Sequence, residues 1–167
     1  SREIYVLAAD GIYLLPLHYA AALPKRPLDL VSKQLFAADE APVAFDFGSF
    51  KVEQTDGKWA LQMTSTSVPA ATAGADDIQR WVDDWRLAGA IGVRPPGKTK
   101  SVGALQIKLK NGETIVIKIL ERGDNTVIAR SDEPIEYILS GDAARRLLAP
   151  PGNLAAAAPA PASAPAK

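Results

Sequence analysis

The segment from Leu105 to Ile119 constrains the fold more than any other part of the sequence. Apolar residues occupy every second position on either side of an Asn111-Gly112 pair, namely Leu105, Ile107, Leu109, Ile115, Ile117 and Ile119. Such alternation is typical of strands with one buried face, and Asn-Gly readily adopts the positive φ angles of a tight turn. The segment therefore predicts an antiparallel hairpin, and with it a sheet that has one covered face.

Further strands are predicted by similar patterns. Short apolar runs flank Asp10-Gly11, and alternating runs flank Asp56-Gly57. Each Asp-Gly pair predicts a tight turn through positive φ angles. The strands predicted outside the Leu105–Ile119 hairpin span Ile4–Leu7, Ile12–Leu15, Val43–Phe47, Phe50–Val52, Trp59–Met63, Val127–Arg130 and Glu136–Leu139.

An amphipathic helix is predicted after Asp76-Asp77. Apolar residues recur there at helical spacing, and the two acids stand at the positive end of the helix dipole. The recurring residues are Ile78, Trp81, Val82, Trp85 and Ala88. A second helix is predicted over Gly141–Leu148, capped by Ser140 or Asp142, and Leu28–Phe36 is expected to form a short helix or helical turn.

These elements predict an α+β fold, an antiparallel sheet of hairpins packed against one main amphipathic helix, with additional short helices. Glu3–Leu7 resembles Ile135–Leu139, which favours a repeated unit. We therefore expect residues 1–38 to be the trailing hairpin and helical turn of a preceding, truncated unit, and residues 39–149 to be the main unit. Thr64–Gly74 is expected to be a loop, and residues 150–167 a disordered Ala/Pro-rich tail.

Composition narrows the classes of function. Lysine plus arginine and aspartate plus glutamate number 19 each, so no net charge draws the chain to nucleic acid or an anionic membrane. The sequence has no cysteine, which excludes disulfides and thiolate chemistry. Its first residues, Ser1 to Ile4, are neither an initiator methionine nor a signal peptide, so we expect that the N-terminus has been trimmed and that any anchor lies in the missing part.

Gly92–Thr99 matches the literal phosphate-loop pattern G-x-x-x-x-G-K-T. A working phosphate loop runs from a strand into a helix and points consecutive backbone N–H groups at the phosphates. Here the predicted helix comes first and a strand follows, and Pro95 and Pro96 have no N–H to donate. We therefore interpret the segment as a basic surface turn and predict no cofactor.

The same turn brings together Arg94, Lys98 and Lys100, which we predict as a possible surface for a protein partner or an anion. Lys108 and Lys110 could extend this surface along the hairpin. The ordinary explanation is that such lysines are solvated on the outer side of a half-exposed sheet. The cluster is therefore a candidate surface without a defined ligand.

No catalytic or metal-binding residue is predicted. His18 is the only histidine and lies in an irregular connection, which favours a surface or packing role. The pairs Asp76-Asp77 and Asp83-Asp84 are adjacent on a helix and diverge by about 100°, so helix capping and solvation explain them better than catalysis. Trp81 and Trp85 would suit a sugar platform if exposed, but they share the apolar stripe of the helix, which favours core packing.

The order of motifs resembles an uncharacterised bacterial family, domain of unknown function 4340, in its short proteobacterial form. The resemblance rests on Gly57–Leu61, the helix start at Ala75–Ile78, the lysine-bearing hairpin and Tyr137–Asp142, and it covers Ile4 to Pro151. It implies one N-terminal membrane helix with the domain outside the cytoplasmic membrane, sometimes encoded beside ABC-transporter components. The family offers no established catalytic residues to transfer.

The function expected from these observations is that of a non-enzymatic accessory or scaffold domain. It would belong to a periplasmic protein that is anchored to the inner membrane, and it would bind a protein partner in the cell envelope, in an ABC-transporter-type complex. Nucleic acid is not an expected partner. The alternative is a small-ligand or polysaccharide-binding module that uses the concave side of the sheet.

Overall fold

The computed structural model describes residues 3–21, 23–64 and 73–152. The chain divides into two compact units, Ser1–Ser32 and Lys33–Lys167, and each is described by itself. Most of the predicted loop Thr64–Gly74 and the predicted tail from residue 153 lie outside the described residues. The assignment of residues 1–38 to a preceding unit stays a prediction.

The first unit is a two-stranded antiparallel hairpin followed by two short 3-10 helices. The predicted hairpin is confirmed by the pairing of its two strands. Its turn is formed by Ala9 and Asp10, neither of which has a positive φ, and Gly11 already belongs to the second strand. The predicted helix over Leu28–Phe36 is wrong in extent, because the 3-10 turn beginning at Pro27 ends at Leu30. The elements are β1 (Glu3–Ala8), β2 (Gly11–Pro16), η1 (Leu17–Ala21) and η2 (Pro27–Leu30).

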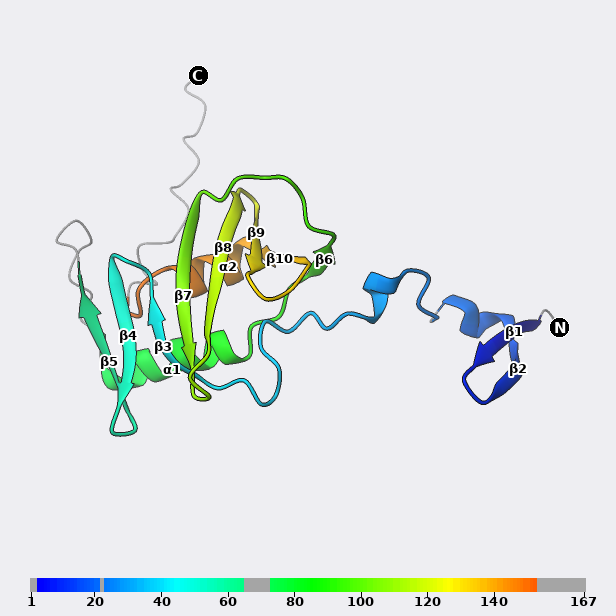
Figure 1. Cartoon of the computed structure of the whole chain (residues 1–167), viewed down its shortest axis with the longest axis horizontal. Coiled ribbons are helices and arrows are strands. Elements are labelled where there is room, and N and C mark those ends of the chain that lie inside the picture. The colour runs from blue at the N-terminus through cyan, green and yellow to red at the C-terminus, as the bar shows by residue number, and fades with distance from the viewer. Residues whose placement is uncertain (1–2, 22, 65–72, 153–167) are drawn as a thin grey trace, which may run out of the picture. The chain divides into compact units, whose positions relative to one another are not determined.

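The second unit is built on one antiparallel sheet of eight strands in the order β5-β4-β3-β7-β8-β9-β10-β6 (Figure 1). The predicted turns connect neighbouring strands, with Asp56 at φ 51° and Gly57 at φ 77° between β4 and β5, and Gly112 at φ 92° between β7 and β8. The strands are β3 (Pro42–Asp46), β4 (Phe50–Thr55), β5 (Lys58–Met63), β6 (Gly92–Arg94), β7 (Gly103–Leu109), β8 (Thr114–Arg122), β9 (Asn125–Arg130) and β10 (Glu136–Ser140).

The described residues of this unit form two helices, α1 (Ala75–Arg86) and α2 (Gly141–Leu148). Both contribute side chains to the same apolar core as the sheet, α1 through Ile78 and Val82 and α2 through Ala144 and Leu147. Of the two caps predicted for the second helix, Ser140 is used, since its hydroxyl accepts a hydrogen bond of 3.3 Å from the Ala143 amide. The fold is therefore α+β, and the sheet is its dominant part.

The inner face of the sheet is the one that meets this core. Phe45 of β3, Val52 of β4 and Ile107 of β7 lie side by side across the sheet, and all three are fully buried. Lys108 and Lys118 alternate with buried neighbours and are exposed on the outer face. Apolar residues alternate along the Leu105–Ile119 hairpin because only one face of the sheet is buried.

Trp81 and Trp85 lie inside the core, with 4% and 0% of their surfaces exposed. Their indole nitrogens donate hydrogen bonds to the carbonyls of Ala149 (2.9 Å) and Leu147 (3.0 Å). Both rings also pack against Phe45, at centroid distances of 5.0 and 5.6 Å. Core packing of the two tryptophans is confirmed, so they form no platform for a sugar.

Candidate functional site

Arg94, the first residue of the predicted basic surface, is held by two carboxylates. Its guanidinium lies 2.5 Å from Glu121 and 2.7 Å from Glu136, two residues that sequence reasoning did not connect with it. Lys98 and Lys100 are exposed and form no ion pair with any residue that the structure describes. Because Arg94 is already neutralised, the predicted surface for a partner or an anion depends on Lys98 and Lys100.

The glycine of the phosphate-loop pattern belongs to this network and not to a nucleotide site. The Gly97 amide donates a hydrogen bond of 2.6 Å to Glu136, whose side chain is only 2% exposed. Burial alone would raise the pKa of Glu136, but the Gly97 amide and the Arg94 guanidinium together hold it below its ordinary value. A carboxylate thus occupies the place where a phosphate would have to bind, and the chain continues into β7, not into a helix.

The remaining polar candidates have structural or surface roles. His18 is exposed in η1, where its ring packs against Tyr19 at 4.3 Å. At the start of α1 the Asp77 carboxylate accepts a hydrogen bond from the Gly74 amide, and Asp83 lies 3.7 Å from Arg86. These contacts confirm helix capping and a solvated outer face. Within residues 3–21, 23–64 and 73–152, no group of three metal-binding side chains is found.

Arg130, at the end of β9, forms the most buried ionic cluster described. Its side chain is 3% exposed and makes two hydrogen bonds to Glu40, at 2.7 and 2.8 Å. It also pairs with Asp132 at 2.6 Å, donates to the carbonyl of Leu35, and lies 5.8 Å from the centre of the Phe36 ring. The cluster therefore joins the end of β9 to the segment from Leu35 to Glu40.

The free edge of β5 is the first feature that suits binding. In the described part of the chain, β5 pairs with β4 and with no strand on its other side. The two-residue turn at Asp56-Gly57 sets the register, so that Lys58, Ala60 and Gln62 exchange hydrogen bonds with β4. The backbone N–H and C=O groups of the alternate residues therefore point away from β4, and these residues are Trp59, Leu61 and Met63.

The same three residues carry the apolar row of β5. Their side chains pack against the core but are only partly buried, whereas Lys58, Ala60 and Gln62 are exposed on the other face. The Trp59 ring lies 6.1 Å from Phe45, which places it at the margin of the aromatic core. The edge thus offers unpaired backbone groups and incompletely covered apolar side chains together.

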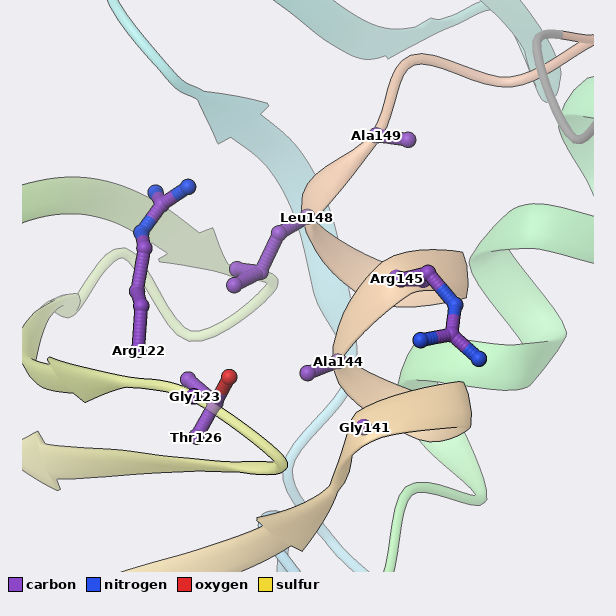
Figure 2. Close-up of a pocket in the computed structure, with 8 residues that line it drawn as sticks. All are labelled: Arg122, Gly123, Thr126, Gly141, Ala144, Arg145, Leu148 and Ala149. Carbon is purple, nitrogen blue, oxygen red and sulfur yellow. The ribbon is translucent and has the colours of Figure 1, made fainter. Parts of the chain in front are cut away.

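A small pocket beside the β8–β9 turn is the second feature that suits binding. Its volume is about 290 Å³, and β8, β9, the turn between them and α2 form its walls (Figure 2). The lining residues are Arg122, Gly123, Thr126, Gly141, Ala144, Arg145, Leu148 and Ala149. The lining combines arginine and hydroxyl groups with aliphatic groups, so the pocket is amphipathic.

The close approach of α2 to the β8–β9 turn creates this pocket. A Cβ atom added at Gly141 would lie only 2.5 Å from the carbonyl oxygen of Asp124, so the backbone can come this near only with glycine there. The sequence contained a signal for the approach, the Ser140-Gly141 helix start directly after a strand. The sequence contained no signal that the β8–β9 turn would form the opposite wall, so the pocket was not predicted.

Comparison with known proteins identifies no relative of this chain. No family model, no curated protein and no solved structure matches it. Among the described residues, no helix is both long enough and apolar enough to cross a membrane. The proposals below therefore rest on the residues themselves, and the location of the protein rests on the family resemblance alone.

Proposed function

We propose that this chain is a non-enzymatic interaction domain whose protein partner adds a strand to the free edge of β5. The observation that carries the proposal is the coincidence of unpaired backbone groups with a half-buried apolar row at Trp59, Leu61 and Met63. Addition of an extended segment to a sheet edge draws its affinity from main-chain hydrogen bonds and its specificity from alternate side chains.

The other edge of the sheet is much less suited to such an addition. There β6 has three residues and is followed at once by Pro95 and Pro96. Short edge strands and prolines are the means by which natural sheets discourage pairing with another chain. In contrast, β5 has six residues, no proline and a single charge, on Lys58.

The arrangement of β5 defines the chemistry of the partner segment. On the inner face, the side chains of the partner segment would pack beside Leu61 and Met63. Every second residue of the segment should therefore be apolar. On the outer face they would lie beside Lys58 and Gln62, which favours polar residues and an acid opposite the lysine. The partner segment is therefore an amphipathic strand of about six residues.

The resemblance to domain of unknown function 4340 supports a cellular setting for this interaction. In that setting the domain is an accessory or scaffold part of a membrane-anchored periplasmic protein, and the partner is a subunit of an envelope complex of the ABC-transporter type. The membrane is contacted only through an N-terminal anchor. The chain acts on no substrate in this proposal and needs no cofactor.

The test compares two substitutions at one position of β5. Leu61→Ala and Leu61→Pro both remove the aliphatic side chain, but only the proline also removes the outward-pointing N–H and places a ring at the edge. A photo-crosslinking residue at Gln62 of the full-length protein, expressed in its own cells, would record the neighbour of the edge. We expect a specific adduct for the parent protein and for Leu61→Ala, and its loss for Leu61→Pro.

Two results would contradict the addition of a strand by a different protein. An adduct that survives Leu61→Pro would show that the edge is not the binding site, provided that thermal unfolding confirms that the variant is folded. An adduct made of two copies of this chain would identify the edge as a dimer interface. Recovery of an ABC-transporter subunit, lost in the proline variant, would support the whole proposal, including the cellular setting.

The alternative function, a small-ligand or polysaccharide-binding module, needs a site other than the two buried tryptophans. The pocket beside Arg122 is one described feature that favours a small ligand. Its volume lies at the lower limit of ordinary ligand pockets, about 300 Å³.

A further inference from the structure

Arg122 and Thr126 stand opposite each other on β8 and β9, so their side chains share one face of the sheet. That face is the inner one, because Thr126 alternates with Ile128, which is fully buried in the core. Arg122, which is exposed at the end of β8, therefore lies on the same side of the sheet as α2.

A β-bulge is the cause of this placement. The register between β8 and β9 shifts between Ile119 and Glu121, which leaves Leu120 as an extra residue in β8. Up to Ile119 the odd-numbered residues of β8 face inward, but beyond the bulge Glu121 faces outward, toward Arg94, and Arg122 faces inward. Bulges commonly re-aim a side chain near a functional site.

The hydroxyl of Thr126 lacks a hydrogen-bond partner among the described residues, although only 5% of the residue is exposed. No buried side-chain polar atom of the described residues lacks a partner, so this hydroxyl reaches solvent. Figure 2 shows Thr126 and Arg122 on the β8–β9 hairpin, with Leu148 extending toward them from α2. The hydroxyl is thus an accessible donor in the lining of the pocket.

The guanidinium of Arg122 is likewise without a carboxylate partner in the part of the chain that the structure describes. Arg145, the other arginine of the lining, pairs with Asp142 on its own helix, and in Figure 2 its guanidinium is turned away from Arg122. Arg122 is therefore the cation available to a ligand in this pocket. The aliphatic wall opposite consists of Ala144 and Leu148.

We propose that this pocket binds a small organic carboxylate that carries a short apolar group. Arg122 makes a bidentate ion pair with the carboxylate, Thr126 donates its hydroxyl to the same group, and the apolar part packs against Ala144 and Leu148. A planar guanidinium matches a carboxylate with two parallel hydrogen bonds, which gives orientation as well as energy. The site is independent of strand addition at β5.

The size and charge of the pocket favour this class of ligand over larger or more highly charged anions. A volume of about 290 Å³ holds a carboxylate with a few carbon atoms. One free guanidinium balances one negative charge, whereas a phosphate dianion would leave charge uncompensated. The aliphatic wall adds affinity only for a ligand that has an apolar part.

The test is an NMR titration of the full chain, labelled with ¹⁵N, with 4-methylpentanoate as the probe. Its amide, 4-methylpentanamide, has the same shape without the charge, and inorganic phosphate has charge without an apolar group. We expect saturable shifts of the Gly123, Thr126 and Gly141 amides with the carboxylate alone. Equal shifts with the amide, or with phosphate, would overturn the proposal.

Two variants and one control locate the binding site. We expect Arg122→Gln to weaken binding of the carboxylate at least about tenfold, as the loss of a charged hydrogen-bonding partner does. Thr126→Val, which keeps the shape and should fold, is expected to weaken it about threefold to tenfold. Lys118→Gln removes an exposed lysine from the outer face of the same strand and should leave binding unchanged.

The variants can also refute the site. Binding that persists in Thr126→Val with unchanged affinity would contradict the role of the hydroxyl. A loss of binding in Lys118→Gln equal to that in Arg122→Gln would show that net charge, not the pocket, attracts the probe. Because the spectrum of each variant reports its fold directly, a variant that does not fold is recognised, and the other then decides.

Discussion

The indole nitrogen of Trp85 donates a hydrogen bond of 3.0 Å to the carbonyl oxygen of Leu147, and this bond joins α1 to the end of α2. The last carbonyl groups of a helix have no partner within the helix, so they need one from elsewhere when they are buried. Trp81 does the same for Ala149, at 2.9 Å. The two tryptophans therefore terminate α2 as well as filling the core.

Replacement of Trp85 by phenylalanine should test this double role. The change removes the donor, leaves the Leu147 carbonyl unsatisfied and creates a small cavity. We expect the free energy of unfolding to fall by about 2–3 kcal/mol, measured by urea denaturation. Trp59→Phe is the matched control, because Trp59 is only half-buried, and it should cost less than about 1 kcal/mol. Equal losses would show that the hydrogen bond contributes nothing.

Arg130 should be far more important for stability than an exposed arginine. Arg130→Met fills a similar volume but leaves Glu40 without its cation, and we expect the free energy of unfolding to fall by about 3 kcal/mol. Arg80→Met is the control, since Arg80 is 69% exposed and lies 3.8 Å from Asp77. The control should change stability by less than about 0.5 kcal/mol. A stable Arg130→Met variant would mean that the cluster is dispensable.

The pH dependence of stability should reflect the same cluster. Hydrogen bonds from Arg130 lower the pKa of Glu40 below its ordinary value of 4.5, against the opposing effect of burial. A carboxyl whose pKa is lowered by folding stabilises the folded state above the pKa of the unfolded chain, and this contribution is lost as the pH falls through the folded pKa. We therefore expect the urea midpoint to drop as the pH falls below about 4.5.

Glu40→Gln provides the comparison for the pH experiment. The variant should be less stable than the parent near neutral pH, and its stability should depend less on pH in the acid range, because one of the perturbed carboxyls is gone. The difference between the two profiles isolates Glu40 from Asp132 and Glu136, whose pKa values are also lowered. Parallel profiles would contradict the assignment.

Gly141→Ala should damage the pocket beside Arg122 more than the nearby Gly123→Ala. The new Cβ would lie 2.5 Å from the Asp124 carbonyl oxygen, so the turn or the helix must move, at a cost of about 2–3 kcal/mol. At Gly123 the nearest atom would be 3.8 Å away, an ordinary contact. Chemical denaturation and the amide shifts of Thr126 would report both effects. Equal stability of the two variants would contradict the close approach.

The hairpins and helices of this fold were predictable because each depends on neighbouring residues. Alternation and an Asn-Gly pair specify β7 and β8, and helical spacing around Trp81 specifies α1. Pairing between β3 and β7 was not predictable, since strands about sixty residues apart in sequence have no local pattern that selects one another. The short edge strand β6 was also missed, because three residues carry too little periodicity.

The candidate sites show the same limit. The lysines and Arg94 were recognised as a cluster from their proximity in sequence, but the carboxylate partners of Arg94 come from β8 and β10. Arg122 was overlooked because strict alternation along β8 places it on the outer face. Only the bulge at Leu120, visible in the pairing of β8 with β9, moves it to the inner face. The free edge of β5 follows from the order of the strands, which no segment encodes alone.

The extra residue in β8, Leu120, also marks the position at which the strand can lose a residue without disrupting its pairing with β9. Removal of Leu120 would leave Ile119 opposite Ile128, and Glu121 and Arg122 opposite the partners they already have. A deletion farther along the strand would instead exchange inside for outside over the residues between the deletion and the bulge. Among descendants of one ancestor, gaps in this strand should therefore accumulate at Leu120.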